Sequence, residues 1–140
     1  MSQPRTRGVL DTSTVIQLSR VRDPSHLPTE PLITAITLAE LSVGPLVTND
    51  PREREVRQLH LQQAEADFDP LPFDESAARA FGRVAASLRR SGRKPAARAY
   101  DALVAATALA HGLPVYTANP RDFEGIEGLD VVAVPIAPAD

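Results

Sequence analysis

Cysteine is absent from the 140-residue chain, and aromatic residues make up only 4% of it. The absence of cysteine excludes disulfide bonds and thiolate metal sites, so any bound metal would have oxygen or imidazole ligands. Because aromatic residues are few among the 43% of hydrophobic ones, the core must be built from Ala, Val, Leu and Ile. A chain of this length forms one domain. We therefore expect a single domain over residues 1–140, with a flexible tail from about residue 136.

Long hydrophobic runs are also missing. No apolar stretch approaches the roughly 18 residues that a membrane span requires. Residues 1–7 are not followed by the apolar core of a signal peptide. The sequence therefore predicts a cytoplasmic protein that does not associate with a membrane.

Lysine is nearly absent as well, because the basic residues are 14 arginines and a single lysine. The net charge of −3 hides an uneven distribution: residues 76–100 carry seven positive charges and no acid, while the remaining 8 basic and 18 acidic residues sum to −10. Such a separation creates a local field that attracts polyanions such as RNA. The alternative interpretation is a solvated helix face. The seven residues are Arg79, Arg83, Arg89, Arg90, Arg93, Lys94 and Arg98.

Short apolar runs alternate with helical periodicity along the whole chain. This alternation predicts an α/β fold, in which a mainly parallel sheet is covered by helices on both faces. Residues 22–31 are predicted to be a loop, and residues 69–73 a linker or an edge strand. The predicted strands are 8–10, 31–34, 113–117 and 131–134, and the predicted helices are 12–20, 37–43, 52–67, 74–91, 98–110 and a short one from 119.

The run from Ala102 to Ala110 contains no charge and no helix breaker. A helix that is apolar all round is buried on most of its surface. Its first turn carries Asp101, and a carboxylate there is costly to bury unless something compensates its charge. The helix dipole contributes only about 0.3–1 kcal/mol. A metal ion, or a cationic side chain such as Arg98 one turn earlier, would supply the rest.

Other acidic and amide side chains are predicted to lie near Asp101. Asp11 and Asn119 follow directly on predicted strands, and Glu40 lies a few residues beyond another. In open α/β sheets the ligand binds outside the carboxyl ends of the strands. Clustered carboxylates raise one another's pKa unless a cation lies between them. Since Mg²⁺ and Mn²⁺ prefer oxygen ligands, this set indicates a metal site.

Each of these side chains also has a structural alternative. Asp11 is suited to cap the helix that follows it. Thr37 and Glu40 match a capping box, in which Glu40 would accept from a backbone amide. Asn119, with Asp122 three residues later, would cap its own short helix.

Four short motifs follow one another along nearly the whole chain. With the linking Gly112-Leu113-Pro114 they are Val9-Leu10-Asp11-Thr12-Ser13, Leu38-Ala39-Glu40-Leu41, Asp101-Ala102-Leu103-Val104-Ala105-Ala106-Thr107-Ala108 and Val115-Tyr116-Thr117-Ala118-Asn119-Pro120-Arg121-Asp122-Phe123. Each motif alone is weak, but in this order they resemble the PIN-domain ribonucleases, and most closely the VapC toxins of bacterial toxin–antitoxin pairs. One position departs from the pattern: the fourth acidic position, 18 residues after the third, is often aspartate in the family and is Asn119 here.

The resemblance implies a PIN-like three-layer α/β/α fold and a metal-dependent endoribonuclease that acts as a toxin. Such an enzyme hydrolyses RNA phosphodiester bonds with metal-activated water. The implied catalytic and metal-binding residues are Asp11, Glu40, Asp101 and Asn119, with Mg²⁺ or Mn²⁺ as the cofactor. Because Asn119 is neutral, Asp122 is a further candidate ligand.

The resemblance also suggests roles for residues around the acidic set. The hydroxyls of Thr12, Ser13 and Thr117 are placed to orient carboxylates or phosphate. The basic residues of segment 76–100 would guide RNA to the acidic site, or would hold the acidic tail of an antitoxin. The implied partners are a VapB-like antitoxin, an RNA substrate and a second copy of the chain in a homodimer.

Other protein classes compete with this interpretation. A non-catalytic PIN-like module that binds RNA or protein would have little reason to keep Asp11, Glu40 and Asp101 together. A DNA nuclease stays open, because the metal chemistry does not distinguish the sugar. A haloacid-dehalogenase-type phosphatase needs an aspartate where Ser13 stands, and a receiver domain needs a lysine near its last strand, whereas the chain has only Lys94.

Overall fold

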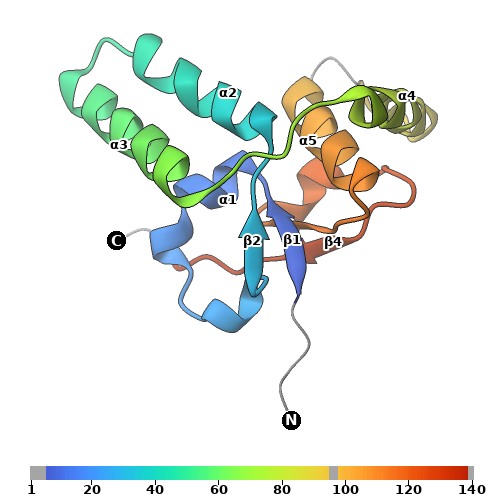
Figure 1. The fold of residues 1–140 in the computed structure, drawn as a ribbon, viewed down its shortest axis with the longest axis horizontal. Coiled ribbons are helices and arrows are strands. Elements are labelled where there is room, and N and C mark those ends of the chain that lie inside the picture. Colours follow the sequence, from blue (N-terminus) through green and yellow to red (C-terminus); the bar gives the residue numbers. More distant parts are fainter. Residues whose placement is uncertain (1–5, 95–97, 139–140) are drawn as a thin grey trace.

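The computed structural model describes residues 6–94 and 98–138. Its strands form one parallel sheet in the order β2–β1–β3–β4. This confirms the predicted α/β fold with a parallel central sheet. Figure 1 labels β2, β1 and β4 of this sheet. The strands are β1 (Arg7–Leu10), β2 (Glu30–Leu32), β3 (Val115–Thr117) and β4 (Val131–Ala133).

The helices are grouped on two sides of the sheet. Helices α2 and α3 form an antiparallel pair on one side, and α4 and α5 pack together on the other, as Figure 1 shows. The α-helices are α1 (Thr12–Ile16), α2 (Ala35–Val43), α3 (Pro51–Asp67), α4 (Glu75–Arg90) and α5 (Ala99–Ala110). The 3₁₀ helices are η1 (Leu18–Arg20), η2 (Pro24–His26), η3 (Gly44–Leu46) and η5 (Pro120–Phe123).

The two central strands separate two hydrophobic clusters. Successive side chains of a strand point to opposite faces of the sheet. Val9 and Val115 belong to the cluster that contains α4 and α5, whereas Leu10 and Tyr116 pack in the cluster that contains α1 and α2. Val9 and Leu10 are both fully buried. The sheet is therefore covered on both faces, which confirms the predicted three-layer α/β/α arrangement.

Helix α5 is the buried helix that its composition predicts. Small side chains such as Ala105, Ala106 and Ala108 are fully buried, so α5 lies close to both α4 and the sheet. The helix ends where Gly112 takes a positive φ of 65°, a conformation that favours glycine. In the described ranges no helix, α5 included, is both long and apolar enough to cross a membrane.

The segment between the first two strands differs from the prediction. A 3₁₀ helix, η2, lies inside the predicted loop, and β2 spans residues 30–32 rather than 31–34. Pro31 pairs with Gly8, which is tolerated because β2 lies at the end of the sheet. Thr34 therefore lies beyond the strand and caps α2, accepting a hydrogen bond from the Thr37 N–H at 3.3 Å.

Two segments predicted to lie outside the main elements, residues 69–73 and the tail, each make backbone contacts with another part of the chain. Leu71, in the segment predicted as a linker or an edge strand, forms a single parallel bridge with Thr34. In the tail after Val134, Ala137 donates its N–H to the Arg20 carbonyl at 2.9 Å and accepts from the Arg20 guanidinium. The chain is thus held at Ala137, within the predicted flexible tail, and residues 139 and 140 lie outside the described part.

Candidate active site

The site is built where the order of the strands reverses. From β1 the chain proceeds to β2 on one side and later to β3 on the other. The carboxyl ends of β1 and β3 therefore flank a crevice, which is where open α/β sheets bind ligands. Asp11 follows β1 and Thr117 ends β3, and the Thr117 hydroxyl donates to Asp11 Oδ2 at 3.0 Å.

Asp11 is a buried carboxylate with a full set of donors. Its Oδ1 accepts from the Thr14 N–H at 3.3 Å and from the Thr14 hydroxyl. Its Oδ2 accepts from the hydroxyls of Ser13 and Thr117, each at 3.0 Å. These bonds confirm that Asp11 caps α1. An ionised carboxylate has about four acceptor positions, so these bonds satisfy Asp11 in the metal-free protein, and a cation would have to replace one of them.

Glu40 faces the same crevice from α2. Because Thr34 is the N-cap of α2, the predicted capping box of Thr37 and Glu40 does not form. Glu40 Oε1 instead accepts from the Thr12 hydroxyl at 2.7 Å. Partial burial raises the pKa of Glu40, and the charge of Asp11 raises it further, against the opposing effect of the Thr12 hydrogen bond. The carboxylate of Asp11, at the end of β1, and that of Glu40, on α2, therefore repel each other.

Asp101, in the first turn of α5, has the most perturbed carboxyl group of the site. Burial, which is the largest cause, and the negative charges of Asp122, Asp11 and Glu40 together raise its pKa to about 6. Arg98 lowers the pKa but does not compensate the other effects. The predicted convergence of acidic residues from three separate segments is therefore present.

Arg98, the alternative partner considered for Asp101, binds a different carboxylate. Arg98 Nη1 donates to Asp122 Oδ1 at 2.9 Å, so the ion pair expected between Arg98 and Asp101 does not form. The reason is that η5 brings Asp122 against the start of α5, a contact between distant segments that local spacing does not reveal.

The predicted cap of the short helix after β3 is also wrong. Asn119 is the N-cap residue of η5, but its side chain makes no capping hydrogen bond. The Asn119 Nδ2 group donates instead to Ser13 Oγ at 3.2 Å, across the crevice. The Asp122 N–H bonds to the backbone carbonyl of Asn119 at 3.0 Å. Asn119 is therefore linked through Ser13 to Asp11, whereas Asp122 is held by Arg98.

The three hydroxyl side chains singled out in the sequence all bind crevice groups. Thr12 donates to Glu40, while Ser13 and Thr117 donate to Asp11. Thr14 is a site residue that the sequence pattern does not single out, although its hydroxyl contacts Asp11 and accepts from the Ala118 N–H at 2.9 Å. A run of three hydroxyl residues after Asp11 is the only available signal, and it does not show which of them turns inward.

The donor set of the crevice consists of carboxylate, amide and hydroxyl oxygens, the ligand types that Mg²⁺ and Mn²⁺ bind. Among the described residues, no group of three or more His, Cys, Asp or Glu side chains is spaced to hold an ion. The carboxylates are therefore close enough to repel one another but do not form a closed cage. The chemistry of these donors fits a divalent cation.

The basic segment is largely neutralised by neighbouring acids. The pairs join α4, the turn after it and the N-cap of α5 to a residue on α4 itself and to the chain between β3 and β4. In the part of the chain that the structure describes, no ion pair involves Arg83, Arg89 or Lys94. The paired residues are Arg79 with Glu75, Arg90 with Glu127 at 3.1 Å, Arg93 with Glu124 at 2.7 Å and Arg98 with Asp122 at 2.9 Å.

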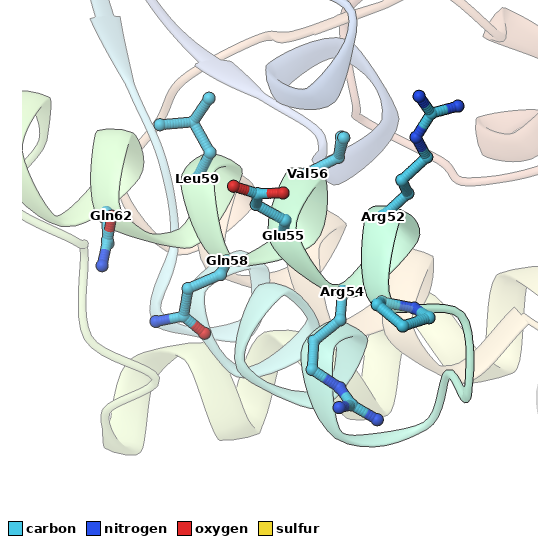
Figure 2. Close-up of a pocket in the computed structure, with 8 residues that line it drawn as sticks. Arg52, Arg54, Glu55, Val56, Gln58, Leu59 and Gln62 are labelled. Carbon is cyan, nitrogen blue, oxygen red and sulfur yellow. The ribbon is translucent and has the colours of Figure 1, made fainter.

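A surface hollow of about 880 Å³ lies away from the acidic crevice, along the outer face of α3. Figure 2 shows Arg52, Val56 and Leu59 projecting from one side of this helix. Val56 and Leu59 are about half exposed, at 52% and 51%. None of the predicted site residues lines this hollow, so its size does not identify the catalytic centre.

Comparison with known proteins gives a consistent result. Residues 9–129 match the model of the PIN domain family. Ribonuclease VapC5 of Mycobacterium tuberculosis is 37% identical over 96% of this chain and 98% of its own length. A crystal structure of VapBC-5, a member of the VapBC family of toxin–antitoxin systems from the same organism, superposes with a TM-score of 0.80 at 36% identity, covering 92% of this chain and 99% of that one. A DNA-bound VapBC structure from Salmonella typhimurium matches with a TM-score of 0.67 at 27% identity, covering 90% and 96%.

Proposed function

Because the chain belongs to the PIN domain family and, within it, to the VapC ribonucleases, we propose that it is an endoribonuclease and the toxin of a toxin–antitoxin pair. The observation that carries this proposal is the convergence of Asp11, Glu40 and Asp101 at the carboxyl ends of β1 and β3. Their mutual repulsion contributes to the pKa of Asp101, which is raised to about 6. A site that gathers negative charge without compensating it is suited to a cation.

The proposed metal ligands are Asp11, Glu40, Asp101 and Asn119, with Mg²⁺ or Mn²⁺ as the cofactor. A divalent cation bound by these residues supplies Lewis-acid chemistry, lowering the pKa of a water and offsetting charge on the phosphate. The hydroxyl of Thr12 holds one oxygen of Glu40 and leaves the other available. Asp101 accepts no hydrogen bond among the described residues, so both of its oxygens are available as ligands.

The contacts of Asn119 and Asp122 separate their proposed roles. Ser13 donates to Asp11 and accepts from the Asn119 amide nitrogen, so it orients the Asn119 side chain beside Asp11. The carbonyl oxygen of that amide is then the fourth ligand. Asp122 is engaged by Arg98, which indicates that it positions the arginine rather than binding the metal.

A VapB-like antitoxin is the proposed protein partner. The solved relatives named above are VapBC proteins, and one of them is bound to DNA. The exposed apolar side chains near the end of α2 and on α3 offer a surface for such a partner, since apolar clusters of this kind mark protein contacts. They are Val43, Leu46, Val47, Val56 and Leu59. A homodimer and a cytoplasmic location remain predictions.

A direct assay tests the proposed activity. The purified protein is incubated with single-stranded RNA and with DNA of the same sequence, in Mg²⁺, in Mn²⁺ and in EDTA. We expect cleavage of RNA only, and only with a divalent cation present. Titration of the metal by calorimetry is done in parallel. Binding of metal with cleavage of DNA would make the protein a DNA nuclease, and absence of metal binding and of cleavage would make it a binding module.

A further inference from the structure

A hollow of about 260 Å³ opens beside Glu40, between α1, α2 and α3, and the proposed chemistry does not use it. It is continuous with the acidic crevice, because Thr12 and Glu40 belong to both. Its volume is slightly below the range of about 300–1,000 Å³ typical of drug-sized ligands, so it has room for one small planar group. The lining side chains are Thr12, Ile16, Glu40, Leu41, Arg57 and His60.

We propose that this hollow is a nucleotide subsite, in which Arg57 binds a phosphate of single-stranded RNA and His60 with Ile16 contacts a base. The occupant is the nucleotide next to the one whose phosphodiester bond is cleaved. This inference rests on the proposed ribonuclease activity and names a second contact region for its substrate.

Arg57 is placed and pre-oriented for a phosphate. Its side chain extends from α3 toward η3. Nη1 donates to the Gly44 carbonyl at 2.9 Å, and Nη2 donates to Glu53. A guanidinium has five N–H donors, so these bonds fix its orientation and leave donors for a second acceptor. Its side chain is 34% exposed. The positive charge of Arg57 thus stands across the hollow from Glu40.

His60 and Ile16 provide the surface for a base. Both also line a second hollow, of about 220 Å³, which continues between α1 and α3 toward Phe68. Ile16 is 42% exposed although it is a large aliphatic residue. Bases bind single-strand sites by stacking on flat or apolar side chains, without any requirement for a particular sequence. The two adjoining hollows would let the strand leave the crevice along this path.

The position of Arg57 favours RNA over a protein segment as the occupant. A substrate phosphate needs a positive group close to the acidic crevice. Arg57 is paired with Glu53, as most basic residues of segment 76–100 are paired with carboxylates, but it lines the hollow beside Glu40. The positive charge of Arg57 would therefore offset the repulsion between a phosphate in the hollow and the carboxylates of the crevice.

The subsite is tested by binding of a fluorescent single-stranded RNA pool about 12 nucleotides long. Every protein carries Asp101→Asn, so that the RNA stays intact. His60→Ala should weaken binding about tenfold because the base no longer stacks on the imidazole. Arg57→Gln should reduce the slope of log affinity against log salt by about 0.7, the value for one phosphate neutralised on a single strand. Arg52→Gln and Gln62→Ala, on the outer face of the same helix, are the matched controls and should match the parent.

A crosslinking experiment needs no substitution in the hollow. RNA containing 4-thiouridine is irradiated with the Asp101→Asn protein, and we expect adducts on peptides containing Ile16 or His60. Crosslinks elsewhere, with parental affinity and salt slope in the His60 and Arg57 variants, would overturn the subsite. If the unsubstituted protein cleaves RNA in that case, the proposed function stands. If it neither binds nor cleaves RNA, both proposals fall.

Discussion

The acidic crevice and the basic segment 76–100 are both dense in charge of one sign, but the fold treats them in opposite ways. In the basic segment, carboxylates from α4 and from the chain after β3 lie beside the arginines. In the crevice, the partners of the carboxylates are hydroxyls, which satisfy hydrogen bonds without neutralising charge. Of the basic residues near the crevice, Arg98 binds Asp122 and Arg57 binds Glu53, so neither forms an ion pair with a crevice carboxylate in the described part of the chain.

We interpret the paired charges of the basic segment as part of the folded surface, and the unpaired charges of the crevice as a ligand site. Exposed ion pairs such as those of the basic segment contribute little to stability, with a median of about 0–1 kcal/mol, but they limit how strongly the segment attracts RNA. The crevice keeps an uncompensated field, which adds to the effect of burial in raising the pKa of Asp101. A cluster of like charges therefore indicates a ligand site only after its partners in the folded chain are known.

The largest effect is expected from Asp101→Asn. The substitution keeps the size of the side chain and removes the charge that would anchor the cation, so cleavage of RNA should fall at least about 100-fold. The rate is measured with Mg²⁺ at saturating concentration. Asp69→Asn, on an exposed residue outside the crevice, is the control and should cleave at the parental rate. A parental rate in Asp101→Asn would refute the metal site.

The next effect distinguishes Asn119 from Asp122. We expect Asn119→Ala to lower metal affinity about tenfold, because it removes the proposed fourth ligand beside Ser13. Asp122→Ala should leave metal affinity near the parental value and lower stability by at most about 1 kcal/mol, since Arg98 loses its partner. Calorimetry and thermal melts measure the two quantities. A greater loss of metal affinity in Asp122→Ala would exchange the two roles.

A smaller effect concerns the dependence of stability on pH. The pKa of Asp101 is raised in the folded protein, from 3.8 to about 6, so the folded state binds more protons than the unfolded state between these values. Stability of the metal-free protein should therefore fall as pH rises through this window. Asp101→Asn should raise the free energy of unfolding at pH 8 by about 1 kcal/mol after allowance for partial exposure, and should have little effect at pH 4. Denaturant titrations at the two pH values measure it, and an equal effect at both would contradict the repulsion.

The smallest effect, on RNA affinity and its salt dependence, is expected in the basic segment. It tests whether the unpaired arginines of this segment attract RNA more strongly than the paired ones. Replacing Arg83 and Arg89 by alanine should weaken RNA binding a few-fold and reduce the salt slope, by about 0.7 for each phosphate that is no longer neutralised. Replacing Arg90 and Arg93 should change the slope less, because their charges are already compensated. Anisotropy titrations at several salt concentrations provide the slopes. Identical slopes in both double variants and the parent would make the segment a solvated helix face.

The local sequence is sufficient for much of the fold. The α5 helix follows from an uninterrupted apolar run ended by Gly112, and α3 begins at Pro51 after the capping residue Asp50. These features depend on neighbouring residues alone. The predicted limits of β2 are wrong because Pro31 is expected to begin the strand at the end of a loop, whereas pairing with β1 draws Glu30 into it. Strand boundaries are decided by the neighbouring strand, which lies elsewhere in the sequence.

The sequence by itself determined which residues could form the site, since the carboxyl ends of the strands and the first turn of α5 follow from hydrophobic pattern and helix propensity. Only the tertiary structure decided what each side chain contacts. Thr12 binds Glu40, Ser13 binds Asn119 and Arg98 binds Asp122, each across a long separation in the chain. The reason is physical: capping and i, i+4 rules describe bonds within one element, whereas these bonds depend on how separate elements pack around the end of the sheet.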